Sequence, residues 1–271
     1  MTDLGADGGE RVFPALLKYW RGQRGMSQLD LALAAEVSAR HISFLETARS
    51  RPSVEMVLTL AETLDVPLRN RNELLRAAGF GARYPEPGLD ALLDGPLGAT
   101  IDTMAAHHEP FPLIVVDRTY RVLRMNRAGR TLVSLTGADP DAADLNLVRL
   151  VIDPSVAAMV TNGPQLAGDV ARRLQREVLH NPLDEELAEL LADIVASGLL
   201  DEHWRSAAVA APDEPVITVD LAMGEVAMSF LTTMTVFNAA SNVTLDELRI
   251  ESWYPRDETT ARWCHELLAP D

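Results

Sequence analysis

The sequence of 271 residues has a single cysteine, Cys264. One cysteine excludes a disulfide bond within the chain and is typical of a protein kept in a reducing compartment. No apolar run approaches the roughly 20 residues that a membrane-spanning helix needs. The first ten residues, MTDLGADGGE, are acidic and rich in glycine, unlike a signal peptide. We therefore expect a soluble, cytoplasmic protein with no membrane partner.

Common catalytic motifs are also missing. The sequence contains no GxSxG elbow, no P-loop and no GxGxxG turn, so the usual hydrolase, nucleotide and dinucleotide signatures are absent. His107, His108 and Glu109 are adjacent rather than spaced like metal ligands on a helix. We expect no catalytic residue, no metal site and no cofactor. An enzyme with a DNA-binding appendage would require a constellation that the sequence does not display.

Positive charge is scarce but unevenly distributed. The net charge is −16, yet residues 11–80 carry ten Lys/Arg against seven Asp/Glu. Residues 81–271 carry 14 Lys/Arg against 30 Asp/Glu. Such asymmetry indicates a mildly basic interaction module joined to an acidic domain, the alternative being ordinary scatter between domains. The length and the 47% hydrophobic share are sufficient for two folded domains.

Residues 12–79 predict five short helices, because apolar residues recur at helical spacing between serine caps. Ser27, Ser38 and Ser53 are the expected N-caps, and Gly79 suits the end of the fifth helix. The second and third helices are separated only by a short break at Glu36-Val37, so they must cross closely. The small Ala32 and the wedge Ile42 fit that crossing, which is the helix-turn-helix arrangement.

The stretch SQLDLALAAEVSARHISFLE resembles the phage-repressor-type family of helix-turn-helix proteins, often called XRE-like. The resemblance covers all five helices and implies that the third helix enters the DNA major groove. It also implies an ion pair between Glu46 and Arg21. Glu36 stands where the family usually has glycine, and a positive φ at a non-glycine residue costs on the order of 1 kcal/mol.

The resemblance assigns roles to the outward-facing residues. Arg40 is the best candidate for reading a base, since a guanidinium can grip guanine with two hydrogen bonds. His41 is either a phosphate contact or a surface residue. Phosphates suit Arg49 and Arg51 in the following loop. The full set of expected DNA-binding residues is Gln28, Ser38, Ala39, Arg40, His41, Ser43, Phe44, Arg49 and Arg51.

The rest of the chain predicts an α+β domain. Residues 81–98 read partly as a linker, followed by a helix from about residue 99 to 107 and a hairpin over 110–126. Residues 145–205 read as helical, and three strands follow over residues 216–254, with a terminal helix from about residue 257. Asn126 is placed to cap the helix after the hairpin. An antiparallel sheet with helices over one face is a PAS-like plan.

The segments EPFPLIVVDRTYRVLRMNRAG, NLVRLVIDP and LDELRIESWYPRDETT resemble regulators with an MmyB-like ligand-binding domain. The resemblance spans about residues 12–262. It implies an XRE-type helix-turn-helix domain at 1–80, a linker at 81–98 and a PAS-like sensor at 99–271 that binds a fatty-acid-like or similarly lipophilic molecule. Met125 and Gly163 stand where the family usually has tryptophan, so the ligand's identity is not carried over.

One wall of the ligand pocket is expected on the strand near residue 230. Its alternating apolar residues, Met228, Phe230, Met234 and Val236, line one face and equally fit an ordinary core. Arg124 is a candidate partner for a ligand carboxylate.

The resulting hypothesis is a transcription regulator that binds an inverted-repeat operator in double-stranded DNA as a homodimer and responds to a small-molecule effector. The alternative is a DNA-binding module, antitoxin-like or scaffold-like, whose C-terminal domain binds a protein partner.

Overall fold

The computed structural model describes residues 12–202, 204, 217–237 and 242–267, and the acidic N-terminal segment lies outside them. The chain forms two compact units. The first consists mainly of residues up to Pro87 and the second mainly of residues from Gly88 onward. Each unit has its own hydrophobic core.

The first unit is all-helical over its described residues. Its helices α1–α5 span Val12–Gln23, Gln28–Ala34, Ala39–Glu46, Val54–Thr63 and Leu68–Ala77. The three predicted serine caps are confirmed, because each side chain accepts a hydrogen bond from the backbone of the helix it precedes. Ser27 and Asp30 form a reciprocal capping box. Gly79 has a φ of +87°, as expected after the fifth helix.

The core of this unit is assembled from one face of each helix. Trp20 of α1, Leu31 of α2 and Ile42 and Leu45 of α3 are all fully buried. Removing such apolar side chains from water is the main force that holds short helices in place. The hydrophobic positions of α3 are therefore committed to the core, which leaves its other faces for solvent or a partner.

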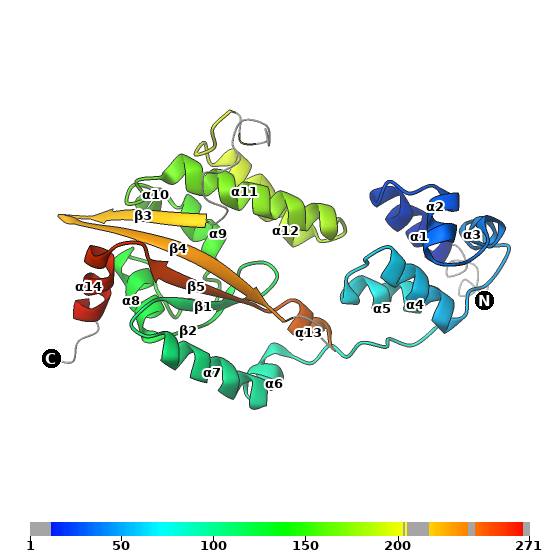
Figure 1. The fold of residues 1–271 in the computed structure, drawn as a ribbon, viewed down its shortest axis with the longest axis horizontal. Helices are drawn as coiled ribbons and strands as arrows, with labels where there is room; N and C mark the ends of the chain where they lie inside the picture. Colours follow the sequence, from blue (N-terminus) through cyan, green and yellow to red (C-terminus); the bar gives the residue numbers. More distant parts are fainter. Residues whose placement is uncertain (1–11, 203, 205–216, 238–241, 268–271) are drawn as a thin grey trace, which may run out of the picture. The chain divides into compact units, whose positions relative to one another are not determined.

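The second unit combines helices with an antiparallel sheet (Figure 1). Its helices α6–α14 span Leu89–Leu93, Pro96–His108, Arg127–Leu135, Leu147–Ile152, Pro154–Ala157, Gly163–His180, Glu185–Ala196, Val243–Asp246 and Glu258–Leu267. Its strands β1–β5 span Leu113–Val116, Val122–Met125, Ile217–Met223, Val226–Val236 and Arg249–Pro255. The strands of the described residues are ordered β2-β1-β5-β4-β3, and every pair is antiparallel.

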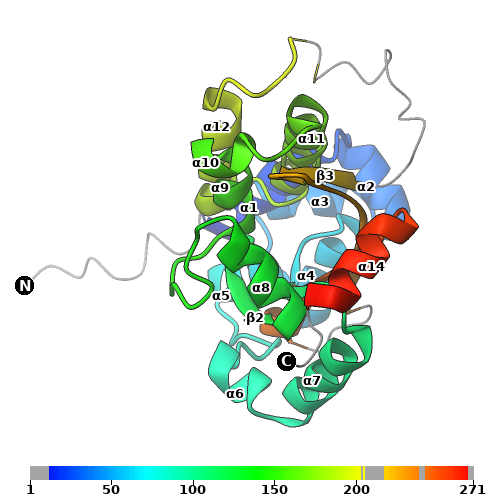
Figure 2. The ribbon, with the colours of Figure 1, turned by 90° about the vertical axis from the view of Figure 1, so that its left-hand side faces the viewer.

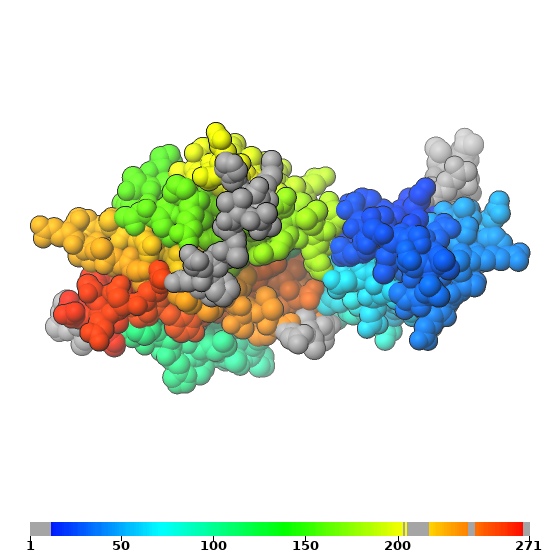
Figure 3. Space-filling model, turned by 45° about the horizontal axis from the view of Figure 1, so that its top comes forward, coloured from blue at the N-terminus to red at the C-terminus, as the bar shows by residue number. Residues whose placement is uncertain are grey.

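Helices cover both faces of this sheet, whereas the sequence predicted helices over one face. On one face α6 and α7 pack Leu93 and Ile101 against Val115 and Ile250. The opposite face carries the larger core, which α11 and α12 cover with Ala171, Leu187 and other side chains. Figure 2 shows the two helical layers with the strands between them. In the space-filling view of Figure 3 the green and yellow residues of the larger helical layer lie above the orange residues of the sheet and the red residues of α14.

The buried Asn126 caps α8 as predicted, accepting from Gly129 N at 2.9 Å, and also accepts from Leu113 N at 3.0 Å. It thereby ties β1 to the helix that follows the hairpin.

The predicted linker, residues 81–98, differs from the structure: α6 and the start of α7 lie within it and belong to the second unit. Five-residue helices such as α6 are too short to show a clear period in the sequence.

Among the described residues, no helix combines the length and the apolar character required to cross a bilayer.

Candidate functional sites

The crossing of α2 and α3 is built as the residue spacing predicted. Ala32 and Ile42 are buried in the core that α2 and α3 share. The amide of Val37 donates to the carbonyl of Ala32 at 2.8 Å, which closes the turn. Glu36 adopts the expected positive φ, +55°. The tight turn presents α3 as a separate outward-facing helix.

The outward face of α3 is rich in hydrogen-bonding groups. Arg40 is exposed, while His41, Ser43 and Phe44 are half-buried. Arg40 lies with its guanidinium carbon 5.1 Å from the centre of the Phe44 ring. Arg49, in the following loop, lies 6.0 Å from the same ring. Contact with the same aromatic ring restricts both arginine side chains, so their positive charges lie close together on this surface.

An ion pair anchors the other end of α3. Arg21 donates to both carboxylate oxygens of Glu46, at 2.6 and 2.9 Å, and the Glu46 side chain is only 3% exposed. Gln28 donates to the same carboxylate at 2.7 Å. Burial by itself raises the pKa of Glu46, but these hydrogen bonds and the positive charge of Arg21 outweigh it and leave the pKa below its usual range. The network joins α1, α2 and α3.

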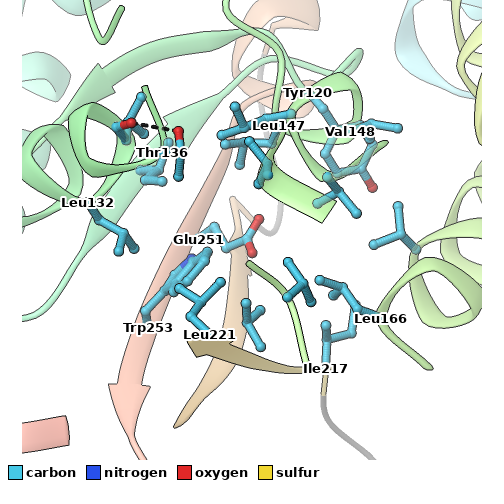
Figure 4. A pocket seen from close by; sticks show the side chains of 18 of the residues that line it. Tyr120, Leu132, Thr136, Leu147, Val148, Leu166, Ile217, Leu221, Glu251 and Trp253 are labelled. Carbon is cyan, nitrogen blue, oxygen red and sulfur yellow. Dashed lines mark hydrogen bonds between the residues drawn. The ribbon is translucent and has the colours of Figure 1, made fainter. Parts of the chain in front are cut away.

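The second unit contains a cavity between the sheet and its larger helical layer (Figure 4). Its volume is about 80 Å³. The lining comes from β1, β3 and β5 and from helices α8 to α11, and is mostly aliphatic: Ile114, Leu132, Val133, Leu147, Val148, Leu150, Val151, Val156, Val160, Leu166, Val170, Ile217, Val219 and Leu221. The polar lining residues are Tyr120, Thr136, Arg173, Glu251 and Trp253. Such a cavity suits a small and mainly apolar guest.

The polar groups of the lining differ in how well they are satisfied. The Tyr120 hydroxyl donates to Glu177 at 2.6 Å, and burial strongly raises the pKa of Tyr120, so this phenol stays neutral. The Thr136 hydroxyl donates to the carbonyl of Val133 at 2.7 Å. Glu251 is different, because its carboxyl points into the cavity (Figure 4) and burial raises its pKa, against the opposing charge of Arg173.

Comparison with known families identifies the families that the parts of the chain with these two sites match. Residues 97–267 match the family described as the MmyB-like transcription regulator ligand binding domain, which is more than half of the chain. The chain belongs to this family. Residues 17–69 match a helix-turn-helix family. A stretch of 90 residues is also 31% identical to the HTH-type transcriptional regulator DdrOP3 of Deinococcus deserti, covering 31% of this chain and 67% of that protein.

The MmyB-like regulator is therefore a DNA-binding transcription regulator with a ligand-binding type of domain. Its α2 and α3 form the helix-turn-helix, and the cavity lies within the domain that the ligand-binding family matches.

In the MmyB-like regulator, the residues predicted to contact DNA lie on α3, at its N-cap and in the loop after it, apart from Gln28 at the start of α2. Two of them have a second role. The Ser38 hydroxyl caps α3 by accepting from His41 N at 3.1 Å, and Gln28 is held by Glu46. Phe44, another residue of the predicted set, lies against the guanidinium groups of Arg40 and Arg49.

None of the five residues predicted to line the pocket is among the residues that line this cavity. Met228 and Phe230 are buried on the correct face of the sheet, but Trp253 packs edge-on against Phe230 and occupies the cavity wall instead. Met234 packs against the core, and Val236 is 57% exposed.

Arg124 faces the other side of the sheet. It pairs in register with Val115, whose side chain contacts the α6–α7 layer, and it forms an ion pair with Asp102 at 2.8 Å. It therefore does not reach the cavity. Arg173, which sequence reasoning missed, is the arginine that lines it.

We predict that Phe44→Leu weakens operator discrimination by about two- to fivefold, because a leucine keeps apolar volume but gives Arg40 no aromatic face, an interaction of roughly 0.5–1 kcal/mol. Phe44→Tyr, which keeps the ring, should bind like the parent. The measurement is competition of selected DNA against random DNA at fixed salt. Equal discrimination by the leucine and tyrosine variants would show that the ring does not position Arg40.

Proposed function

We propose that this transcription regulator senses a small lipophilic effector in the cavity of its C-terminal domain and thereby changes its affinity for an operator. The observation that carries the proposal is the aliphatic cavity within the ligand-binding domain. A dry apolar cavity of about 150 Å³ is large enough for benzene, so the 80 Å³ present here suits a guest of a few heavy atoms. A longer fatty-acid-like chain would require the helical layer to move outward.

The DNA-binding half supports a dimeric mode of action. Helix-turn-helix regulators of this kind bind two half-sites about 34 Å apart, one helical turn of DNA. We propose a homodimer on an inverted-repeat operator, with Arg40 reading a base and Ser43 and Ala39 facing the groove. Phosphate contacts come from Arg49 and Arg51, with His41 and Gln28 beside them. Coupling between ligand and DNA in such proteins is typically about 1–3 kcal/mol.

Native mass spectrometry of the purified full-length protein, followed by denaturing analysis of anything it releases, tests this proposal. We expect a dimer that carries one discrete extra mass per chain, from a compound with an apolar body. Adding the released compound back should shift operator binding by about five- to 150-fold in either direction. A protein that carries no small molecule, and whose DNA binding responds to no added lipophilic compound, would instead favour a protein partner for the C-terminal domain.

A further inference from the structure

Glu251 is an unusual residue for the wall of an apolar cavity. It lies on β5 with 8% of its surface exposed, and its carboxyl group projects among aliphatic side chains (Figure 4). No described side chain forms an ion pair with it. Two residues along the same strand, and so on the same face of the sheet, Trp253 also lines the cavity. Its indole N–H is buried without a hydrogen-bond partner of ordinary geometry among the described residues.

An acceptor and a donor thus stand side by side in a wall that would pack better with aliphatic residues. Buried polar groups are almost always paired, and an unpaired one in a native protein calls for an explanation. The indole N–H lies close enough to Glu251 to favour its charged form, but the contact lacks the geometry of a hydrogen bond, so the N–H has no partner among the described residues. Both groups become satisfied if a guest supplies one donor and one acceptor at the head of an apolar body.

Burial raises the pKa of Glu251 and the charge of Arg173 opposes that rise; with Glu251 as the carboxylate that Arg173 favours, the charges around the cavity balance only if this head is neutral. Arg173, half-buried on α11, supplies the positive charge that opposes the negative charge of Glu251. An added carboxylate would place two anions against one guanidinium. An added ammonium would place two cations against one carboxylate. Either excess charge is costly in a site lined mainly by aliphatic side chains, whereas a neutral head leaves the balance unchanged.

We propose that the effector carries a neutral head group that both donates and accepts hydrogen bonds, as an alcohol or a primary amide does, with its donor on Glu251 and its acceptor on the indole N–H of Trp253. This inference rests on the proposed function of the cavity as the effector site. The cavity volume limits the apolar body to a short chain in the present conformation.

The test uses five probes of similar size on the full-length protein: butan-1-ol, butanamide, butanoate, butylammonium and pentane. Binding is measured by calorimetry, with the thermal midpoint as a second readout. We expect the alcohol and the amide to bind about tenfold more tightly than the other three, the effect of hydrogen bonds made to a buried charged group. Because a glutamine side chain still accepts a hydrogen bond, Glu251→Gln should keep the preference of the neutral polar probes over the apolar one. Butanoate should bind this variant more tightly than it binds the parent, since it then faces Arg173 without the charge of Glu251.

Glu251→Leu should remove the preference, so that butan-1-ol and butanamide bind no more tightly than pentane. Glu225→Leu, an equal change at an exposed turn residue, is the matched control and should bind all five probes like the parent. If Glu251→Leu does not fold, binding of the five probes to the parent and to Glu251→Gln still tests the proposal, because it compares neutral with charged head groups.

The possible failures are distinguishable. Tightest binding of butylammonium, lost in Glu251→Gln, would overturn the neutral head in favour of a cation. Tightest binding of butanoate to the parent would overturn it in favour of an acid held by Arg173. If pentane binds as tightly as the neutral polar probes to both the parent and the leucine variant, the cavity is an effector site without the proposed head-group preference. If none of the five probes binds, the proposed function of the cavity itself fails.

Discussion

Replacing Arg21 by alanine is expected to lower the free energy of unfolding of the helix-turn-helix domain by about 3 kcal/mol. The reason is the position of Glu46, whose side chain is 3% exposed and whose two oxygens both accept from Arg21. Without the guanidinium, a buried carboxylate is left with Gln28 as its remaining side-chain hydrogen-bond donor. Hydrogen exchange of peptides from α1 to α5 in the full-length protein, followed as a function of urea, measures the loss.

Two variants separate the ion pair from other effects of the substitution. The double variant Arg21→Met/Glu46→Leu removes both charges together and should recover most of the lost stability, because buried ion pairs often contribute little compared with apolar residues. Arg40→Ala removes an exposed arginine and should leave the stability within about 0.5 kcal/mol of the parent. If Arg21→Ala were as stable as Arg40→Ala, the network of Arg21, Gln28 and Glu46 would not stabilise the domain.

The effect of pH gives an independent readout of the same pair. The pKa of Glu46 is lowered in the folded protein, so its contribution to stability is present above the ordinary glutamate pKa of about 4.3. That contribution is lost as the pH falls through the lower, folded value. In Arg21→Ala the carboxyl has lost the main groups that held its pKa down, so it protonates at higher pH. The difference between parent and variant should therefore be largest near neutral pH and shrink in acid.

The helix-turn-helix domain was predicted from sequence in detail because its signals are local. A serine cap, a small residue at a helix crossing and a wedge ten positions later are all set within a few turns of chain. The ion pair from Arg21 to Glu46 spans 25 positions and was available only through the family resemblance. Even Glu36, which breaks the family's glycine pattern, keeps the left-handed turn conformation, since the cost of about 1 kcal/mol is small beside the packing of the two helices.

The cavity could not be predicted in the same way. Strand alternation correctly shows which residues share a face of the sheet, so Met228 and Phe230 lie on the cavity side. Which of them meets open space depends on α9 to α11, whose sequence does not reveal where they cross the strands. Glu251 alternates with Ile250 and so resembles a solvent-facing residue. The signal that it faces inward is Trp253, two positions later, since a tryptophan rarely occupies a fully solvated strand position.

Replacing Arg40 by alanine is expected to lower the preference of the regulator for its operator over random DNA by about tenfold to a hundredfold. A guanidinium that holds both acceptors of a guanine contributes roughly 1–3 kcal/mol of discrimination, and its loss leaves the non-specific phosphate contacts in place. Arg40 is exposed at the start of α3 and its side chain lies on the Phe44 ring, which supports its proposed role as the base reader. Because the residue is exposed, the fold should be unchanged.

The measurement begins with selection of DNA from a random pool by the parent protein. Affinities of each variant for the selected and for random DNA are then compared at several salt concentrations, because both depend steeply on ionic strength. Arg40→Lys keeps the charge without the two-point grip and should lose most of the same preference. Arg51→Ala is the contrasting variant: it should weaken both kinds of DNA alike and reduce the salt dependence by about one ion.

The pattern across these variants identifies the role of α3 more firmly than any one of them. A base-reading residue changes the ratio of the two affinities, whereas a phosphate-binding residue changes their common level. If Arg40→Ala reduced both affinities equally, Arg40 would be a phosphate contact, and sequence reading would pass to Ser43 and Ala39 on the same face of α3. If it changed neither affinity, α3 would not be the helix that enters the major groove, despite the helix-turn-helix geometry around it.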